Sequence, residues 1–238
     1  MPELKMPEFK VPDVRPPNFE RIAPPTLAAL RRVQGLTATA SDVLDGMGWN
    51  LAVPAGLLQP RFEKPVIIAG QALTLRYLPE RRRIDTRETL TSQSKLAHQV
   101  VYDMAQPGDV MVVEASVRYP ISVMGGRAAA SGALAGLAGA IIDGGVRDID
   151  EIRLAGFPVW STTVTPISGK GRLEPASINA PVSCHGVQVQ AGDLVLADET
   201  GVCFIPIEIA AEVAARIVEV AKNEAGDLGL PPSLDSAD

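Results

Sequence analysis

The sequence predicts one α/β domain built as a layered sandwich of sheets and helices. In the middle of the chain, helical patterns alternate with short apolar strands, and further strands cluster toward the end. No linker interrupts residues 26–223, so the whole pattern belongs to one domain. Hydrophobic residues make up 46% of the chain and aromatic residues only 4%, which predicts a large core of aliphatic side chains. The pattern leaves an α/β and an α+β arrangement of the layers open.

Both ends of the chain are predicted to lie outside this domain. Residues 1–25 carry seven prolines among charged residues. Because proline fixes φ and lacks an N–H donor, we expect an extended arm, either disordered or lying across a neighbouring subunit. Residues 224–238 are predicted to form a polar tail, which contains Pro231 and Pro232.

The first half of the domain is predicted to mix helices and strands. The pair Pro24–Pro25 opens a helix for which Thr26 is the candidate N-cap. A long aliphatic run that ends in the alternating LTLRYL predicts a strand, in which Gly70 suggests a bulge or a bend. The periodicities predict helices over 37–47 and 94–105 and strands over 65–78 and 110–114.

The second half is predicted to be richer in strands. Small residues predict a helix that begins near Arg127, and the apolar AGAII that follows predicts a buried strand. Glycine, serine and proline at residues 165–180 predict a loop. The remaining expected elements are strands over 138–142, 158–164, 182–190, 194–197 and 202–205, and helices over 149–155 and 207–223.

The composition excludes several classes of function. The net charge is −6 and the short cluster Arg81–Arg83 lies among acidic residues, so we expect no nucleic-acid partner. No apolar run reaches the ~18 residues of a membrane span and no signal peptide is recognisable, so we expect a cytoplasmic protein. Cys184 and Cys203 form no CxxC motif and are expected to be buried small hydrophobic residues. With only His98 and His185, a multi-histidine metal site is excluded.

A glycine pair in the middle of the chain is the first candidate for a binding site. Gly125 and Gly126 precede the helix that is expected to begin near Arg127. The free N–H groups at such a helix start bind anions, and glycines let a ligand approach the backbone. A tight turn that only serves helix packing is the alternative.

The dipeptide Arg147–Asp148 is the second candidate, because it stands between a predicted strand and a predicted helix. An arginine at a strand end is suited to grip a carboxylate through two hydrogen bonds. Asp148 is placed either to cap the following helix or to hold Mg²⁺, which needs few protein ligands.

Together these residues predict a site for a small 2-oxo acid on a divalent metal. The metal would polarise the keto oxygen and stabilise an enolate. Residues 124–160 contain no lysine, which argues against Schiff-base chemistry; Lys170 is the nearest lysine downstream.

These residues also resemble a known family. Gly126, twenty further residues and Arg147-Asp148-x-x-Glu151 resemble the G-x20-R-D-x2-E/D signature of the RraA-like family. The flanking AGAIIDGGVRDIDEIRLAGFPVW and VQVQAGDLVLADETGVCFIP are similar to it as well, over residues 26–223. The family includes the metal-dependent 4-hydroxy-4-methyl-2-oxoglutarate / 4-carboxy-4-hydroxy-2-oxoadipate aldolases and the regulator of ribonuclease activity A. The resemblance implies an α/β/β sandwich related to swivelling phosphohistidine domains, in a homotrimer or homohexamer with sites at subunit interfaces.

The resemblance implies a class II pyruvate aldolase that uses Mg²⁺ or Mn²⁺, with oxaloacetate decarboxylation as a companion activity. Arg147 would bind the pyruvyl group and stabilise the enolate, and Asp148 would ligate the metal. The amides that would hold the pyruvate carboxylate belong to Gly125, Gly126, Arg127 and Ala128.

The chain departs from many aldolase members at Gly126, where they carry an acidic residue that orders the metal-bound water. Glu151 is the first candidate to replace that catalytic acid because its motif position matches. Glu114, Asp198 or a carboxylate of a neighbouring subunit are the alternatives. The loop Ser168–Arg172 is either a contact for a second substrate carboxylate or a surface hairpin. The alternative function is a non-catalytic regulator that binds a ribonuclease or a helicase.

Overall fold

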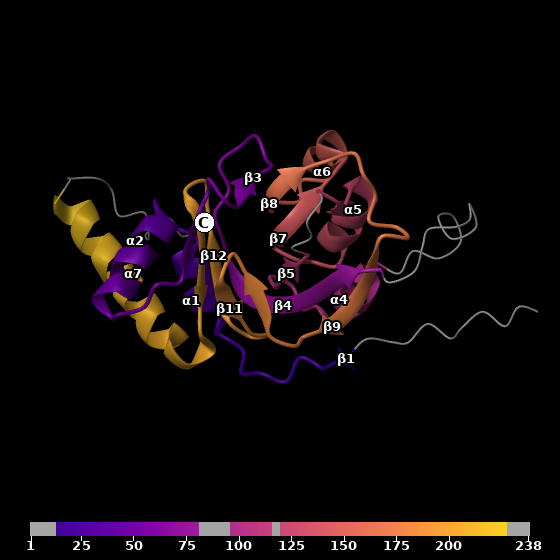
Figure 1. Cartoon of the computed structure of the whole chain (residues 1–238). Coiled ribbons are helices and arrows are strands. Elements are labelled where there is room, and N and C mark those ends of the chain that lie inside the picture. The colour runs from indigo at the N-terminus through magenta and orange to yellow at the C-terminus, as the bar shows by residue number, and fades with distance from the viewer. Residues whose placement is uncertain (1–12, 81–95, 116–119, 228–238) are drawn as a thin grey trace, which may run out of the picture.

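A computed structural model describes residues 13–80, 96–115 and 120–227, and Figure 1 shows how its elements are arranged. The predicted cluster Arg81–Arg83, residues 1–12 of the proline-rich arm and residues 228–238 of the tail lie outside these ranges.

A mostly parallel sheet forms the centre of the fold. Its neighbouring parallel strands, in order, are β4 (Ile68–Pro79), β5 (Val110–Glu114), β7 (Gly139–Val146) and β8 (Val159–Val164). The short β6 (Ser122–Met124) pairs with the end of β7, and β3 (Gln59–Pro60) pairs with β8. Because α5 (Gly126–Leu134) and α6 (Ile149–Leu154) each begin after one of these strands, both helix starts lie at the carboxyl edge of the sheet.

Antiparallel strands form a second layer. β12 (Leu194–Ala197) pairs with β13 (Gly201–Ile205) and with the first residues of β4, and β2 (Ala52–Pro54) pairs with β13. β4 therefore passes from this layer into the parallel sheet. The hairpin of β10 (Val182–Cys184) and β11 (Val187–Val189) contributes to the same core, which contains Trp160 and Phe204.

Helices cover both outer faces. α4 (His98–Met104), α5 and α6 pack on the parallel sheet around residues such as Ile142 and Val146. On the opposite side, α1 (Pro24–Leu30), α2 (Leu36–Gly46) and α7 (Ile207–Asp227) pack on β12 and β13. Figure 1 shows the two helical groups at opposite ends of the molecule with the strands between them. The predicted α/β/β sandwich is confirmed, and the α1–α2–α7 group adds a further layer to it.

The structure corrects several local predictions. The single strand expected over 182–190 is the hairpin of β10 and β11. Thr26 does not cap the first helix, because the helix already begins at Pro24 and its N-cap residue is Ala23. Of the bulge or bend expected at Gly70, the bulge is wrong, because β4 keeps its register with β12 there, and the bend stays a prediction. A Cβ on Gly70 would overlap the carbonyl oxygen of Gly108, so the glycine permits a close backbone approach. The expected loop at 165–180 contains β9 (Leu173–Ile178), which pairs with β4 and with β1 (Asp13–Val14). The strands that pair with β9 are distant in sequence, and Pro175 within β9 is a residue typical of loops.

The described part of the proline-rich arm lies along the protein's own fold. β1 pairs with β9, and Phe19 packs against the same core as α4, α5 and α6. The guanidinium of Arg21 lies 2.5 Å from the carboxylate of Asp109 and over the ring of Phe19. These contacts tie residues 13–23 to the body of the same chain.

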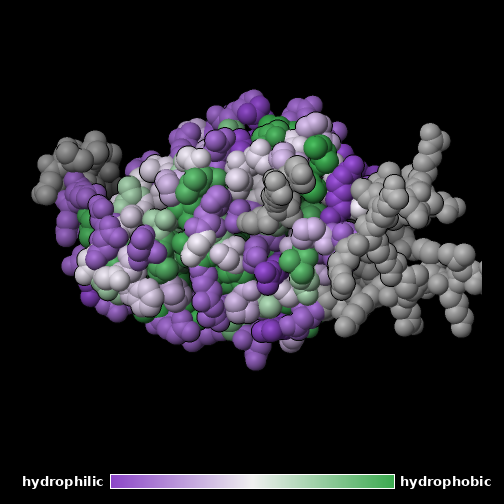
Figure 2. All heavy atoms as spheres, viewed as in Figure 1, coloured by the Kyte–Doolittle hydropathy of each residue, from purple (hydrophilic) through white to green (hydrophobic). Residues whose placement is uncertain are grey.

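The helices of the described ranges offer no candidate for a membrane span, since none unites sufficient length with sufficient apolar character. Figure 2 shows hydrophobic residues in separate patches among hydrophilic ones on one face of the molecule. Leu134 and Leu154, at the ends of α5 and α6, are the most exposed large hydrophobic side chains reported among the described residues, at 91% and 88%.

Candidate functional site

The glycine turn joins β6 to α5. Gly125 is extended and α5 begins at Gly126, with no side chain capping the helix start. The first helical hydrogen bond runs from the N–H of Ala129 to the carbonyl of Gly125. The amides of Gly126, Arg127 and Ala128 therefore precede the helical hydrogen-bond ladder, as the first donors of a helix do. The helix start expected near Arg127 is confirmed, and its binding of an anion stays a prediction.

The side chains of α6 fill the space above this turn. A Cβ on Gly126 would overlap the Oε2 and Cβ atoms of Glu151. A Cβ on Gly125 would lie 2.5 Å from Oδ2 of Asp148 and 3.1 Å from Cγ of Arg147. Both positions must be glycine in this arrangement, because any side chain would displace the charged residues of α6 and of the β7 end.

Arg147 and Asp148 lie side by side at the end of β7. The Nε atom of Arg147 is 3.2 Å from Oδ2 of Asp148, and their side chains are 39% and 34% exposed. This exposure leaves both groups accessible to a ligand from solvent.

Asp148 adopts a left-handed backbone, with φ 52° and ψ 50°. It occupies the N-cap position of α6, but its carboxylate makes no capping hydrogen bond, so the capping alternative is wrong. The left-handed conformation turns the carboxylate toward Gly125 instead. A non-glycine residue in this region carries a conformational cost of about 1–2 kcal/mol, smaller for Asp, and such costs are concentrated at functional sites.

The remaining candidates are placed differently. Arg127 is exposed on the first turn of α5, and the carbonyl of Ala128 accepts a hydrogen bond from the Tyr102 hydroxyl at 2.8 Å. Glu114 pairs with Arg76 at 3.1 Å and also accepts the amide of Ser183. The structure thus brings Gly125, Gly126, Arg147, Asp148 and Glu151 together and leaves Glu114 occupied elsewhere.

Asp198 does not reach the site. It follows β12, whose end pairs with Ile68 at the start of β4, so it lies at the opposite edge of the parallel sheet. Its carboxylate is buried and accepts three hydrogen bonds, from the amide and hydroxyl of Thr37 and the amide of Thr200. Among the three candidate carboxylates of this chain, only Glu151 faces the glycine turn.

The loop Ser168–Arg172 is fixed beside β6. The carbonyl of Ser122 accepts the amide of Gly169, and the amide of Ser122 donates to the carbonyl of Ile167, both at 2.8 Å. Lys170 is exposed, whereas Arg172 donates to the carbonyl of Ser168. The loop adjoins the strand that leads to the glycine turn, and its contact with a substrate stays a prediction.

The histidines and cysteines lie outside this site. His98 is buried between Tyr77 and Tyr102, and burial lowers its pKa to about 4. Cys184 and Cys203 are buried free thiols, as predicted, and burial raises the pKa of both. Neither thiol is therefore a ready nucleophile.

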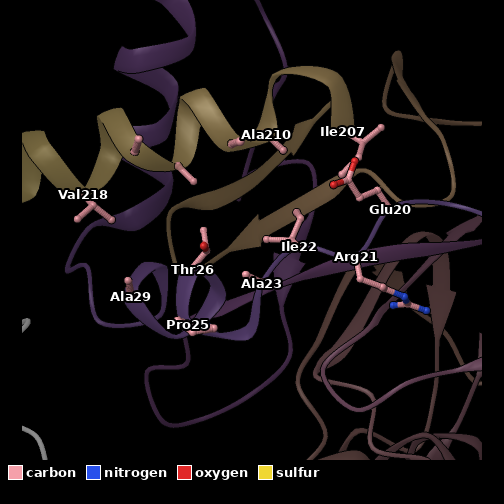
Figure 3. Close-up of a pocket in the computed structure, with 13 residues that line it drawn as sticks. Glu20, Arg21, Ile22, Ala23, Pro25, Thr26, Ala29, Ile207, Ala210 and Val218 are labelled. Atoms are coloured by element: carbon pink, nitrogen blue, oxygen red, sulfur yellow. The ribbon is translucent and has the colours of Figure 1, made fainter.

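A cavity of about 750 Å³ lies elsewhere, between α1 and α7 (Figure 3). Its wall is largely alanine and aliphatic, and it contains none of the predicted site residues. Figure 3 labels Glu20, Arg21, Ile22, Ala23, Pro25, Thr26, Ala29, Ile207, Ala210 and Val218 around it. A pocket so poor in converging polar groups is not suited to hold a small keto acid.

The residues at the glycine turn fit a hard cation that has few protein ligands. Asp148 and Glu151 direct carboxylate oxygens to neighbouring glycines of one turn. Within the described ranges, no three His, Cys, Asp or Glu side chains gather into a complete ligand cage. Magnesium commonly takes one or two carboxylates and completes its shell with water and substrate oxygens, so this donor set suits it.

The fold is a layered α/β/β sandwich, and the carboxyl edge of its parallel sheet carries a glycine turn and an Arg–Asp dipeptide. The chain belongs to the RraA-like family: the model described as Aldolase/RraA matches residues 37–204, which include the whole candidate site.

Individual relatives agree with this assignment. A Halalkalibacterium halodurans protein provisionally named 4-hydroxy-4-methyl-2-oxoglutarate aldolase is 30% identical over 170 residues, 71% of this chain and 72% of that protein. Protein DlpA of Legionella pneumophila is 28% identical over 79% of this chain, which spans only 29% of DlpA. The structure of Streptomyces coelicolor RraAS2, described as an unusual member of the RNase ES inhibitor RraA family, aligns with a TM-score of 0.68 and 29% identity. That alignment covers 89% of this chain and 97% of RraAS2.

Proposed function

We propose that this protein is a divalent-metal-dependent lyase acting on a 2-oxo acid. The reaction is retro-aldol cleavage of a 4-hydroxy-2-oxo acid with release of pyruvate, decarboxylation of oxaloacetate, or both. The observation that carries this proposal is the Glu151 carboxylate in the space above Gly126, beside Arg147 and Asp148. It supplies a proton-transfer group at the position where the sequence shows only glycine.

The glycine turn and Arg147 bind the part of the substrate that becomes pyruvate. The first amides of α5 donate hydrogen bonds to the substrate carboxylate, and the helix dipole favours its charge. The guanidinium of Arg147 donates to the 2-oxo oxygen and stabilises the negative charge that develops there. Because this charge is larger in the transition state than in the ground state, the interaction favours catalysis over binding.

The two remaining roles, metal binding and proton transfer, belong to Asp148 and Glu151. Asp148 holds Mg²⁺ or Mn²⁺, which when bound supplies Lewis-acid polarisation of the 2-oxo group. In retro-aldol cleavage, Glu151 takes the proton of the 4-hydroxyl group, directly or through water, as the C3–C4 bond breaks and C4 becomes a carbonyl. A proton then returns to C3 to complete pyruvate. Decarboxylation needs only this second proton transfer, because no hydroxyl proton must leave.

We also propose a homotrimer or homohexamer with sites at the subunit interfaces. The partly exposed Arg147 and Asp148, and the strongly exposed Leu134 and Leu154 on neighbouring helices, support a surface that another copy covers. Analytical ultracentrifugation should show a trimer or larger species, which Leu154→Glu weakens if this surface is the interface. A fully active monomer would contradict this assembly.

The test of function is a screen of 2-oxo acids with Mg²⁺ and Mn²⁺, followed by pyruvate release. We expect turnover with the metal and none in EDTA or in Arg147→Ala. Full activity in EDTA would contradict the proposal. Tight capture of a ribonuclease or helicase without any turnover would instead favour the regulator.

A further inference from the structure

Strand β7 changes its neighbours just before it reaches the candidate site. Up to Asp143 it pairs with β5, and from Gly145 onward it pairs with β6. Its register with β8 also shifts between Ile142 and Gly145, where β7 has one more residue than its partner. Such bulges redirect a strand and are common next to active sites. Arg147 follows the end of β7, and the glycine turn follows the end of β6. The bulge therefore sets how Arg147 lies against the glycine turn.

A partly buried polar network surrounds this bulge on the sheet face opposite α5 and α6. The hydroxyl of Thr162 accepts the amide of Gly144 and donates to Oδ1 of Asp143, both at 3.2 Å. It also lies 3.0 Å from Nε2 of His185. The second oxygen of Asp143 accepts the backbone amide of His185 at 3.1 Å.

The bonding capacity of one hydroxyl matches this arrangement. A threonine hydroxyl donates once and accepts twice. Since it donates to Asp143 and accepts from Gly144, its remaining lone pair can accept a hydrogen bond from His185. This requires the His185 tautomer that carries its proton on Nε2. Thr162 thereby connects the bulge of β7 to β8 and to the β10–β11 turn, and no replacement without a hydroxyl preserves all three bonds.

We propose that Thr162, together with Asp143 and His185, is a positioning residue for Arg147 and Asp148. It touches neither of them. By holding the amide of Gly144 it fixes the bulge three residues before Arg147, and hence the place of Arg147 and Asp148 against the glycine turn. The catalytic consequence rests on the proposed function, whereas the effect on metal binding rests only on Asp148 as a ligand.

The experiment compares Thr162→Val with Thr163→Val and Thr162→Ser. Thr163 is the matched control, because its hydroxyl has a single long contact of 3.4 Å with the neighbouring carbonyl of Val164. The measurements are Mn²⁺ affinity by calorimetry, and kcat and KM for the best 2-oxo acid, at a temperature where all variants are folded by circular dichroism.

We expect Thr162→Val to reduce Mn²⁺ affinity or kcat by about 10-fold or more, because replacing a residue that orients metal ligands typically has an effect of this size. Thr162→Ser should restore most of it and Thr163→Val should match the wild type. Wild-type Mn²⁺ affinity and kcat in folded Thr162→Val would overturn the proposal. If Thr162→Val does not fold, His185→Asn takes its place, because this variant keeps the backbone amide that donates to Asp143 and removes the imidazole ring. Wild-type Mn²⁺ affinity and kcat in His185→Asn would then overturn the proposal.

The two proposals fail in different ways. If the wild type binds Mn²⁺ but turns over no 2-oxo acid, the proposed function fails, and the Mn²⁺ affinities of the three variants still test the positioning role. If the wild type is active and Thr162→Val is equally so, only the positioning role fails.

Discussion

Aspartates in two parts of this molecule differ in how much of their hydrogen-bonding capacity the fold already uses. Asp198, beside the antiparallel strands, is buried and accepts three hydrogen bonds. Asp193, at the turn before β12, is also buried and accepts the amides of Gln190 and Ile207. Asp148 keeps a third of its side chain exposed, and its carboxylate makes no capping hydrogen bond to the helix that follows.

This difference separates structural carboxylates from a carboxylate available to a ligand. A buried carboxylate must be satisfied by the protein, because desolvation without partners is costly. Asp148 sits at a helix start where an aspartate normally caps, yet its backbone turns the carboxylate away. Apart from the contact of Oδ2 with Arg147, its acceptor capacity therefore remains for a cation.

Asp148→Asn is the variant expected to have the largest effect, and it tests whether the Asp148 carboxylate binds a ligand. We expect a loss of about 10³-fold in kcat/KM, because removal of a metal ligand costs several kcal/mol of transition-state stabilisation. The melting temperature should hardly change, since Asn tolerates the left-handed backbone. Steady-state kinetics and thermal unfolding measure the two effects. Undiminished turnover in this variant would remove Asp148 from the site.

Glu151→Gln is expected to have the next largest effect. Loss of a positioned proton-transfer group should reduce kcat for retro-aldol cleavage by about 10²-fold. The effect on oxaloacetate decarboxylation should be smaller, because no hydroxyl proton leaves in that reaction. Asp150→Asn, on the same helix turn, is the matched control and should behave like the wild type. Equal losses in Glu151→Gln and Asp150→Asn would mean that charge near the helix start, not Glu151, matters.

Asp198→Asn tests the other side of the comparison. Whichever oxygen becomes an amide nitrogen, at least one of the donors from Thr37 and Thr200 loses its acceptor. We expect unfolding in urea to show a loss of about 1–3 kcal/mol with kcat unchanged. A variant that keeps its stability but loses turnover would place Asp198 in the catalytic machinery after all.

The smallest expected effect is a pH dependence of stability from Asp193. Burial raises the pKa of Asp193 above its ordinary value of about 3.9. Between about pH 3.9 and the raised pKa, the folded protein keeps a proton that the unfolded chain has released. The contribution of Asp193 to the free energy of unfolding is therefore complete below about pH 3.9 and is lost as pH rises through the raised pKa. Asp193→Asn should remove this slope from the unfolding free energy measured against pH. An unchanged slope would show that the two amide donors already offset the burial.

Much of the fold follows from local patterns. The strand Val110–Glu114 and the start of α7 at Ile207 were predicted at the residues where they occur. β9 was missed because its partners, β4 and β1, are distant in sequence and nothing local distinguishes LEPASI from a loop. For Asp148 the sequence left capping and metal binding open, because the residue type suits both. Capping is wrong because the backbone of Asp148 is left-handed, whereas a capping residue is normally extended.

The chemical groups of the site could be predicted from the sequence: a glycine pair before a helix, and an arginine and an aspartate between a strand and a helix. Glycine's lack of a Cβ and the preferences of charged groups are local properties, so they can be read from the chain. Which carboxylate lies over the glycines depends on how the elements pack together. Glu114, Asp198 and Glu151 are equivalent as residue types, but packing of β7, α5 and α6 brings Glu151 onto Gly126 and gives the other two different partners.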